Sequence, residues 1–216
     1  MARLPPFPDR AEAGRRLAAE LPALDRPIVL GLPRGGVPVA AAVASAIGAP
    51  LDVFVVRKLG LPAQPELAMG AIASGGVRVL NEDVLREASV PAAVLDEVTA
   101  RELELLRVRE RLFRDDRMPV PLAERDVVVV DDGIATGATM RAALHAVEEL
   151  KPRRVLAAVP VVPRATLEAF ARDGLELVAV LVPDAFIAVG AWYRDFRPTT
   201  DDEVRSLLRR GLERFV

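Results

Sequence analysis

Five short aliphatic runs, rich in β-branched residues, recur along the chain between segments with helical spacing. Proline, glycine or charged residues bound each run, which is typical of buried strands. The runs span Ile28–Leu32, Leu51–Val56, Val127–Val130, Val155–Val162 and Leu175–Val182. Strands that are apolar on both faces need cover on both sides. The pattern therefore predicts an α/β fold, an open parallel sheet of about five strands with helices on both faces.

Most connections between these runs have the length and spacing of single crossover helices. Apolar residues recur at helical intervals in Val37–Ile47, Met140–Leu150 and Arg164–Arg172. The connection from the second run to the third is much longer, about 70 residues. It must therefore contain structure of its own.

The long connection, at about residues 59–125, divides into two parts. Leu59–Gly76 is rich in glycine and proline, which predicts a mobile loop or an irregular hairpin. Asn81–Arg114 carries two helix start signals and a charged helical repeat, which predict two helices. After Val182 most of the aromatic residues gather in a C-terminal cap, at about 183–216, with a final helix from about Thr200. We expect a single domain over residues 1–216.

Composition narrows the class of protein without naming an activity. The chain has 216 residues, 51% of them hydrophobic and 28% charged, which is typical of a globular protein. A net charge of −2 gives no electrostatic argument for a nucleic-acid partner. No apolar run suits a membrane span or a secretion signal, and there is no cysteine for disulfides. We therefore expect a cytoplasmic protein without a membrane partner.

The segment VVVVDDGIATGATMRAAL, residues 127–144, carries the most specific chemistry in the sequence. A buried strand delivers Asp131 and Asp132, and a short glycine- and threonine-containing loop then opens a helix. Backbone N–H groups at a helix start, with the hydroxyls of Thr136 and Thr139, favour a bound phosphate. The two carboxylates can accept hydrogen bonds from sugar hydroxyls. A phosphorylated ribose satisfies both halves, although a strand-ending turn followed by helix caps is the structural alternative.

The whole string resembles the motif of type I phosphoribosyltransferases that binds 5-phosphoribosyl 1-pyrophosphate (PRPP). This chain departs from the family pattern at Gly133, where an aliphatic residue is usual, and we interpret the glycine as loosening the loop. The chain is identified as a member of a group of bacterial phosphoribosyltransferases whose acceptor is unassigned. The resemblance implies a 5′-phosphate site made of Gly133, Ile134, Ala135, Thr136, Gly137, Ala138 and Thr139.

Two segments near the first two strands are similar to the pyrophosphate site of that family. Arg34, Gly35 and Gly36 follow the first strand, where a glycine-rich backbone and a cation can hold a diphosphate. Arg57 and Lys58 follow the second strand, and ligands collect at the carboxyl ends of parallel strands. An ordinary turn and a solvated basic pair are the alternatives.

The C-terminal cap resembles the region that closes the base pocket in hypoxanthine-type members of the family. Phe186 or Trp192 is a candidate to stack on a flat heterocycle, and Asp195 lies in the same segment. Plain core packing is the alternative for both aromatic residues.

The resemblance implies that a nitrogen nucleophile displaces pyrophosphate from C1 of PRPP, with positive charge developing on the ribose. Asp131 and Asp132 would fix the ribose, and Mg²⁺ would be held by the substrate near these residues rather than by a protein cluster. Ala135 occupies the position where hypoxanthine-type relatives carry an aspartate base. Glu66, in the predicted mobile segment, is the alternative base by location only, and an exposed loop carboxylate is the other interpretation. His145 suits a helix surface.

Two classes of function remain open at this point. The first is an enzyme that takes PRPP and a nitrogenous, nucleobase-like acceptor as substrates. The second is a PRPP- or nucleotide-sensing regulator without catalysis, because this fold also serves repressors that keep the acidic pair. A hydrolase is disfavoured because no nucleophile accompanies the loop. The resemblance also implies a homodimer, and the acceptor stays unassigned.

Overall fold

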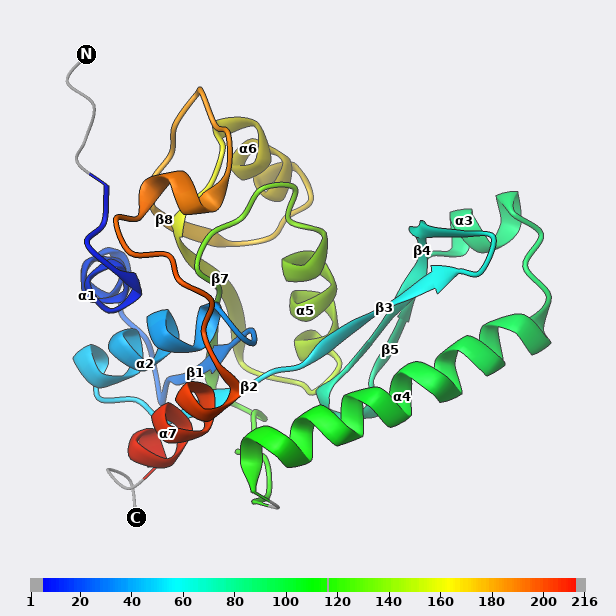
Figure 1. Ribbon diagram of the computed structural model, residues 1–216, viewed down its shortest axis with the longest axis horizontal. Coiled ribbons are helices and arrows are strands. Elements are labelled where there is room, and N and C mark those ends of the chain that lie inside the picture. The colour runs from blue at the N-terminus through cyan, green and yellow to red at the C-terminus, as the bar shows by residue number, and fades with distance from the viewer. Residues whose placement is uncertain (1–5, 116, 213–216) are drawn as a thin grey trace.

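The computed structural model describes residues 6–115 and 117–212, and its centre is a five-stranded parallel sheet (Figure 1). The strands lie in the order β2-β1-β6-β7-β8. This arrangement confirms the predicted open α/β sheet and each of its five strands. The strands are β1 (Ile28–Gly31), β2 (Leu51–Val53), β6 (Asp126–Val130), β7 (Arg154–Val161) and β8 (Leu177–Leu181).

Helices cover both faces of the sheet, as its apolar strands require. Val128 and Val130 of β6 pack in one core cluster, and Val127 and Val129 pack in the other. The first cluster lies beneath α1 (Arg10–Glu20), α2 (Gly36–Ile47) and α7 (Asp201–Leu212). The second lies beneath α5 (Ala138–Glu148) and α6 (Arg164–Arg172). The predicted crossover helices and the final helix are confirmed, whereas α1 was not predicted.

The long insertion forms an arm that projects from the body of the molecule (Figure 1). The body is the five-stranded sheet with the helices that cover it. The strands of the arm make an antiparallel three-stranded sheet, and the β3–β4 pairing shifts register on both sides of Gly60. This confirms the irregular hairpin, and the mobility of the segment stays a prediction. The two predicted helices are present as α3 and α4. The arm comprises β3 (Val56–Leu61), β4 (Gln64–Ala73), the short turn η1 (Ser74–Gly76), β5 (Arg78–Leu80), α3 (Glu82–Glu87) and α4 (Ala92–Arg114).

The second predicted strand, Leu51–Val56, is divided where the chain leaves the body for the arm. The N–H of Phe54 still donates to the carbonyl of Gly31, but the N–H of Val55 donates to Oγ of Ser74 at 2.9 Å. Where α4 ends and the chain returns to the sheet, Arg114 donates from Nε to Oδ1 of Asp52 at 3.0 Å. Both ends of the arm are therefore fastened to the same edge of the sheet.

The C-terminal cap folds back over the N-terminal helix. The short helix η2 (Val189–Trp192) lies beside Phe7, whose N–H donates to the carbonyl of Trp192 at 2.7 Å. The outer bounds of the expected domain, residues 1 and 216, lie outside the described residues. Among the helices that the structure describes, none has both the length and the apolar character needed to cross a bilayer.

Candidate active site

The sheet reverses its winding direction between β1 and β6, and the predicted site residues gather at the carboxyl ends of these two strands. β2 lies on one side of β1, while β6, β7 and β8 follow on the other. The N–H of Leu32 continues the pairing by donating to the carbonyl of Val130 at 2.9 Å. Ligands of open α/β sheets bind in the crevice at such a switch point. Topology alone therefore indicates a site here.

The glycine loop after β1 packs directly against the acidic pair after β6. A Cβ on Gly35 would lie 2.1 Å from Oδ2 of Asp132, and one on Gly36 would lie 2.8 Å from Cα of Asp131. Neither contact is possible for a side chain, so this close approach requires glycine at both positions. Two motifs that are about 95 residues apart in the sequence thus form one surface.

The two carboxylates differ in their partners. Oδ1 of Asp131 accepts the backbone N–H of Asp132 at 2.8 Å. Oδ2 of Asp132 accepts Nε of Arg10 at 2.9 Å and lies 2.8 Å from Nη2 of the same guanidinium. Asp132 therefore has a cationic partner, and within the described residues Asp131 has none.

Burial and mutual repulsion change the titration of this pair. Burial, followed by the charge of Asp132, raises the pKa of Asp131 to about 8. Burial also raises the pKa of Asp132, although Arg10 opposes that shift. At neutral pH Asp131 therefore favours its protonated form, and a bound cation would displace that proton.

Arg10 and Tyr193 complete the surroundings of Asp132 and were not predicted as site residues. The guanidinium of Arg10 stacks 4.0 Å from the ring centre of Phe196 and donates to the carbonyl of Arg197. The hydroxyl of Tyr193 donates to the carbonyl of Asp132 at 2.5 Å, and burial raises the pKa of this phenol. The Asp9–Glu12 cap could have predicted α1. Nothing local indicates that α1 reaches a carboxylate more than 120 positions away.

The predicted phosphate loop is partly exposed to solvent, and side chains of α5 and α6 donate hydrogen bonds to its backbone carbonyls. Thr136 and Thr139 are exposed, and Gly137 is the N-cap of α5, with φ of +82°. Thr166 donates its hydroxyl to the carbonyl of Ala135 at 2.7 Å, and Arg141 donates to that of Thr136 at 2.9 Å. The N–H groups in the first turn of a helix lack intrahelical partners. The loop thus presents backbone donors to an anion.

Gly133 has a packing reason that the sequence did not reveal. A Cβ at this position would lie 2.5 Å from Cγ1 of Val189 in the cap. The glycine thus lets the cap close against the loop. Its role is close packing, and our interpretation that it loosens the loop has no support in these contacts.

The three predicted cations, Arg34, Arg57 and Lys58, do not all lie at the same site. Arg34 lies 3.7 Å from Asp201, and Arg57 donates to Glu102 from Nε at 2.8 Å and from Nη2 at 2.5 Å. Arg57 lines a cavity beside Leu32 and Pro33, whereas Lys58 lines a different cavity next to Ala138. Neighbouring residues of a strand point to opposite faces. The structure therefore brings Arg57, and not Lys58, to the loop after β1.

The candidate acceptor residues and the candidate base lie in several places. Phe186 and Trp192 pack against the cluster around Phe7 and Tyr193, and Asp195 pairs with Arg197, which lowers the pKa of Asp195 to about 2. The side chain of Glu66 is 95% exposed on the arm, 3.4 Å from Lys58. In this conformation Glu66 pairs with Lys58 and forms no hydrogen bond or ion pair with Asp131 or Asp132.

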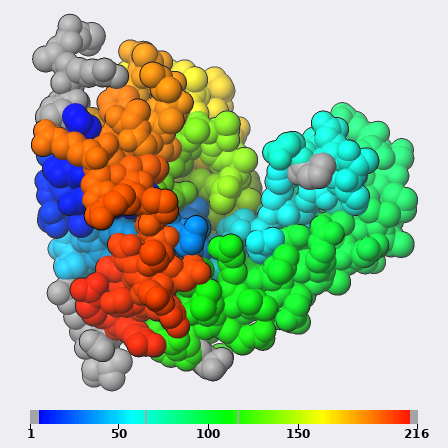
Figure 2. All heavy atoms as spheres, in the orientation of Figure 1, coloured from blue at the N-terminus to red at the C-terminus, as the bar shows by residue number. Residues whose placement is uncertain are grey.

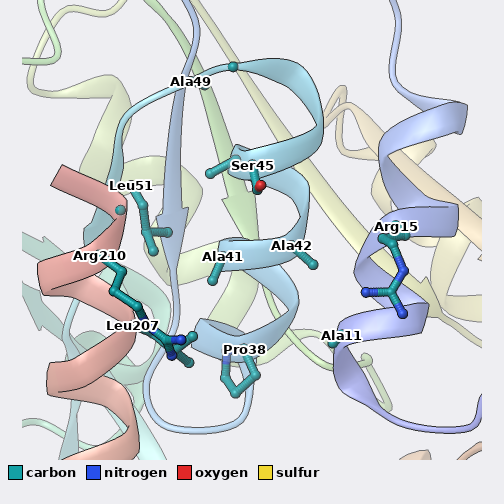
Figure 3. Close-up of a pocket in the computed structure, with 13 residues that line it drawn as sticks. Ala11, Arg15, Pro38, Ala41, Ala42, Ser45, Ala49, Leu51, Leu207 and Arg210 are labelled. Carbon is teal, nitrogen blue, oxygen red and sulfur yellow. The ribbon is translucent and has the colours of Figure 1, made fainter. Parts of the chain in front are cut away.

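A separate groove of about 380 Å³ lies between α1, α2 and α7 (Figure 3). Small apolar residues of α2 form its floor, and Arg15 and Arg210 lie at opposite sides. None of the predicted site residues lines it. In the part of the chain that the structure describes, no three acidic or histidine side chains converge as metal ligands.

Comparisons with known proteins identify the family to which this chain belongs. The family model of the phosphoribosyl transferase domain matches residues 6–173. A Mycobacterium tuberculosis protein named "Putative phosphoribosyl transferase" is 49% identical over 212 residues, which are 97% of this chain and 48% of that protein. The "Bifunctional protein PyrR" of a Synechocystis strain is 33% identical over 104 residues, 46% of this chain and 58% of its own. The chain belongs to the phosphoribosyltransferase family.

A solved structure extends the agreement to the fold as a whole. The crystal structure of TT1426 from Thermus thermophilus has a TM-score of 0.87 and 45% sequence identity. The similarity covers 95% of this chain and 99% of that one. The mycobacterial relative is longer, and this chain spans about half of its length.

Proposed function

We propose that the protein binds PRPP with Mg²⁺ and transfers its phosphoribosyl group to a nitrogenous, nucleobase-like acceptor, releasing pyrophosphate. The observation that carries this proposal is the contact of the Gly35–Gly36 backbone with Asp131 and Asp132 at the switch point of the sheet. That contact unites a diphosphate-type loop with the carboxylates of a sugar site. Membership of the phosphoribosyltransferase family supports the same reaction.

Each part of the site suits one part of PRPP. The exposed Thr136 and Thr139, with the free N–H groups at the start of α5, suit the 5′-phosphate. Asp131 and Asp132 suit the ribose hydroxyls and stand where positive charge develops during transfer. Arg34 and the Gly35–Gly36 backbone suit the pyrophosphate, which carries the departing negative charge.

The acidic pair also fits a magnesium ion that arrives with the substrate. Mg²⁺ is usually held by one or two carboxylates together with substrate oxygens. Asp131 has a raised pKa and forms no ion pair with a described residue, so a divalent ion beside it would relieve the repulsion within the pair. The ion would neutralise charge on the leaving pyrophosphate. The residues that would hold it are Asp131 and Asp132.

The first experiment is calorimetric titration of PRPP and Mg²⁺ into the wild type and an Asp131→Asn/Asp132→Asn variant. We expect binding in the micromolar range that the variant loses. Asp202→Asn, which removes an exposed carboxylate paired within α7, is the matched control and should bind as the wild type does. A folded wild type that does not bind PRPP would refute the proposal.

The acceptor is sought by screening nitrogenous heterocycles for pyrophosphate release. Phe186, Trp192 and Asp195 are the candidate contacts, and their replacement should raise KM for the acceptor more than KM for PRPP. Glu66 is the candidate base only if the arm moves toward the body. Glu66→Gln should then lower kcat at unchanged PRPP affinity, and an unchanged kcat would remove Glu66 from the mechanism.

A regulator that binds PRPP without turning it over is the second candidate. The observation that favours it is Arg10, which already pairs with one of the two carboxylates. The same relatives include a protein named as bifunctional, which is compatible with either role. PRPP binding without pyrophosphate release across the acceptor screen would favour the regulator.

We also propose that the protein forms a homodimer. Leu105, Val108 and Leu112 are exposed along one side of α4, and an apolar stripe of this kind suits a second copy. Sedimentation of the wild type should give the mass of a dimer. Leu105→Glu/Leu112→Glu should give a monomer if this stripe is the contact.

A further inference from the structure

The insertion helix α4 contributes a cation to the edge of the candidate active site. Arg109 lines a cavity of about 140 Å³ together with Leu32 and Pro33 of the loop after β1. Arg57 from β3 and Thr139 from the first turn of α5 line the same cavity. Three separate elements, the pyrophosphate-type loop, the phosphate loop and the arm, therefore meet around one space.

Among the described residues, Arg107 and Arg109 are the arginines of α4 without an ion pair or hydrogen bond, and of these two only Arg109 lines the cavity. Arg101 and Arg111 lie within 4 Å of glutamates of the same helix, and Arg114 pairs with Asp52 and Glu110. Within the described residues, Arg109 makes no ion pair or hydrogen bond. An unpaired guanidinium that faces a concave space raises the local positive potential.

The rest of the cavity is also suited to an anion. Arg57 donates to Glu102 from Nε and Nη2, which orients this guanidinium and leaves Nη1 for another acceptor. Thr139 is exposed and adds a hydroxyl at the start of α5. None of the described residues that line the cavity is acidic. Two guanidinium groups that face one space repel each other, and an anion between them removes that repulsion.

We propose that Arg109 is a binding residue for the pyrophosphate group of PRPP, so that the helical arm completes the anion site that the body begins. This proposal rests on the proposed function, because PRPP supplies the diphosphate. It gives the insertion a role in substrate binding in addition to its structural one. Arg57, held by Glu102, would be the second cation of the same subsite.

Calorimetric titration with three probes separates this contact from general electrostatics. The probes are PRPP, inorganic pyrophosphate and ribose 5-phosphate, each with Mg²⁺. Arg109→Gln should weaken PRPP and pyrophosphate binding by roughly tenfold, the effect of losing one charge-assisted hydrogen bond, and leave ribose 5-phosphate binding unchanged. Arg107→Gln is the matched control, because Arg107 is an exposed arginine of α4 that does not line the cavity. It should change none of the three affinities.

The outcomes distinguish this inference from the proposed function. If PRPP binds equally well to the wild type and to Arg109→Gln, the inference is wrong and the proposed function stands. Equal losses of PRPP affinity in the Arg107 and Arg109 variants would also overturn the inference. They would indicate that α4 acts through its overall positive charge and not through a contact of Arg109. If the wild type binds pyrophosphate through Arg109 but does not bind PRPP, the anion site stands and the proposed function fails.

Discussion

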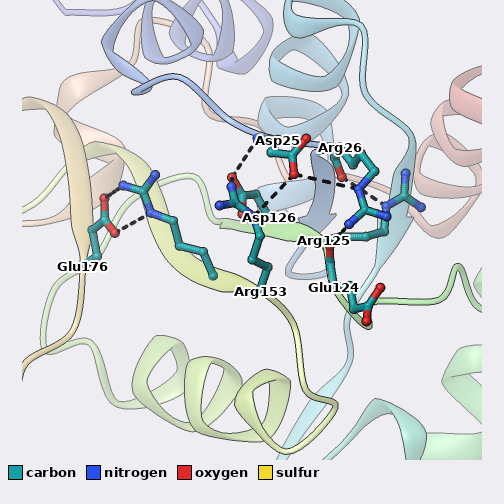
Figure 4. Close-up of polar contacts among 8 residues, drawn as sticks. Asp25, Arg26, Glu124, Arg125, Asp126, Arg153 and Glu176 are labelled. Atoms are coloured by element: carbon teal, nitrogen blue, oxygen red, sulfur yellow. Dashed lines mark hydrogen bonds and ion pairs between the residues drawn. The ribbon is translucent and has the colours of Figure 1, made fainter.

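Strand β6 carries acidic residues at both of its ends, and the two ends differ in how the carboxylates are paired. At the first end, Asp126 is fully buried, and its Oδ2 accepts the N–H of Asp25 at 2.8 Å and Nη2 of Arg153 at 2.5 Å (Figure 4). At the other end, Asp131 accepts only the N–H of its neighbour among the described residues. A carboxylate that is partly buried without a cationic partner, as Asp131 is, costs stability. Of the two ends of β6, the end at the switch point carries the carboxylate without a cationic partner.

The two ends of β6 also differ in how much open space surrounds them. The body and the arm are separate masses with a notch between them, and the α5 side of the body faces that notch (Figure 2). The cavities that Thr139 lines lie between the arm and the body. The Asp126 end lies among loops that pair with one another, where Arg26 and Arg125 donate to backbone carbonyls (Figure 4). One end of the strand therefore contributes stability, and the other is the end at which we propose that the ligand binds.

The largest expected effect on stability comes from removing the charge of Asp126, the paired carboxylate at the start of β6. Asp126→Asn removes the charge that Arg153 faces in a buried position, and we expect a loss of about 2 to 3 kcal/mol in the free energy of unfolding. Because Arg153 is half-exposed, we place this value below the range of about 3 to 5 kcal/mol that is typical of breaking a fully buried pair. Urea denaturation measures the change.

Glu176→Gln is the control for this variant, because Glu176 pairs with Arg154 at the surface of the same region (Figure 4). It should lose less than about 1 kcal/mol. PRPP affinity should be unchanged in both variants. Equal losses in the two variants would show that the burial of Asp126 does not govern its contribution.

Asp131→Asn tests the other end and should have the opposite sign. The folded-state pKa of Asp131 is raised to about 8 from 3.8, so between these pH values the folded form holds a proton that the unfolded form releases. The wild type should therefore lose stability as pH rises from 4 to 8, and the variant should lose less. At pH 8 we expect the variant to be more stable by about 1 to 2 kcal/mol, measured by urea denaturation across that range. Parallel stability profiles would contradict the assignment.

Gly133→Ala tests whether close packing between the loop after β6 and the C-terminal cap contributes to stability. Its methyl group would overlap Cγ1 of Val189, and such overpacking costs about 1 kcal/mol or more. Val189→Ala should restore most of that loss in the double variant, because it removes the overlapping atom. Thermal unfolding of the two single variants and the double variant measures the coupling. Additive losses would show that the two residues do not press on each other.

The sheet was predictable from the sequence because each strand carries its own signal. The runs around Val29 and Val128 are apolar on both faces and follow one another at the spacing of crossover helices. The acidic pair and the glycine loop were also predictable, since each is a local string. Their mutual contact followed from the rule that ligands gather at the carboxyl ends of parallel strands.

The missed residues belong to contacts between distant segments. Arg10 reaches Asp132 from a helix that the aliphatic pattern did not reveal, and Arg109 reaches the cavity only because the arm folds back beside the body. Gly133 resembled a flexible position because the sequence shows the missing side chain and not Val189, which fills the space. Such contacts depend on the angles between packed elements, and no local pattern encodes those angles.

The smallest expected effect concerns Arg10, the one cation of the ligand end that touches the acidic pair among the described residues. Arg10→Lys keeps the charge but loses the two-point contact with Asp132 and the planar stacking on Phe196, so unfolding should change by less than about 1 kcal/mol. Arg10→Gln removes the charge that opposes the raised pKa of Asp132. In that variant, PRPP and Mg²⁺ binding should therefore weaken at a higher pH than in the wild type as the solution is acidified, whereas Arg10→Lys should follow the wild type. Calorimetric titrations across pH make the comparison, and identical profiles for the glutamine variant would show that Arg10 only packs against the cap.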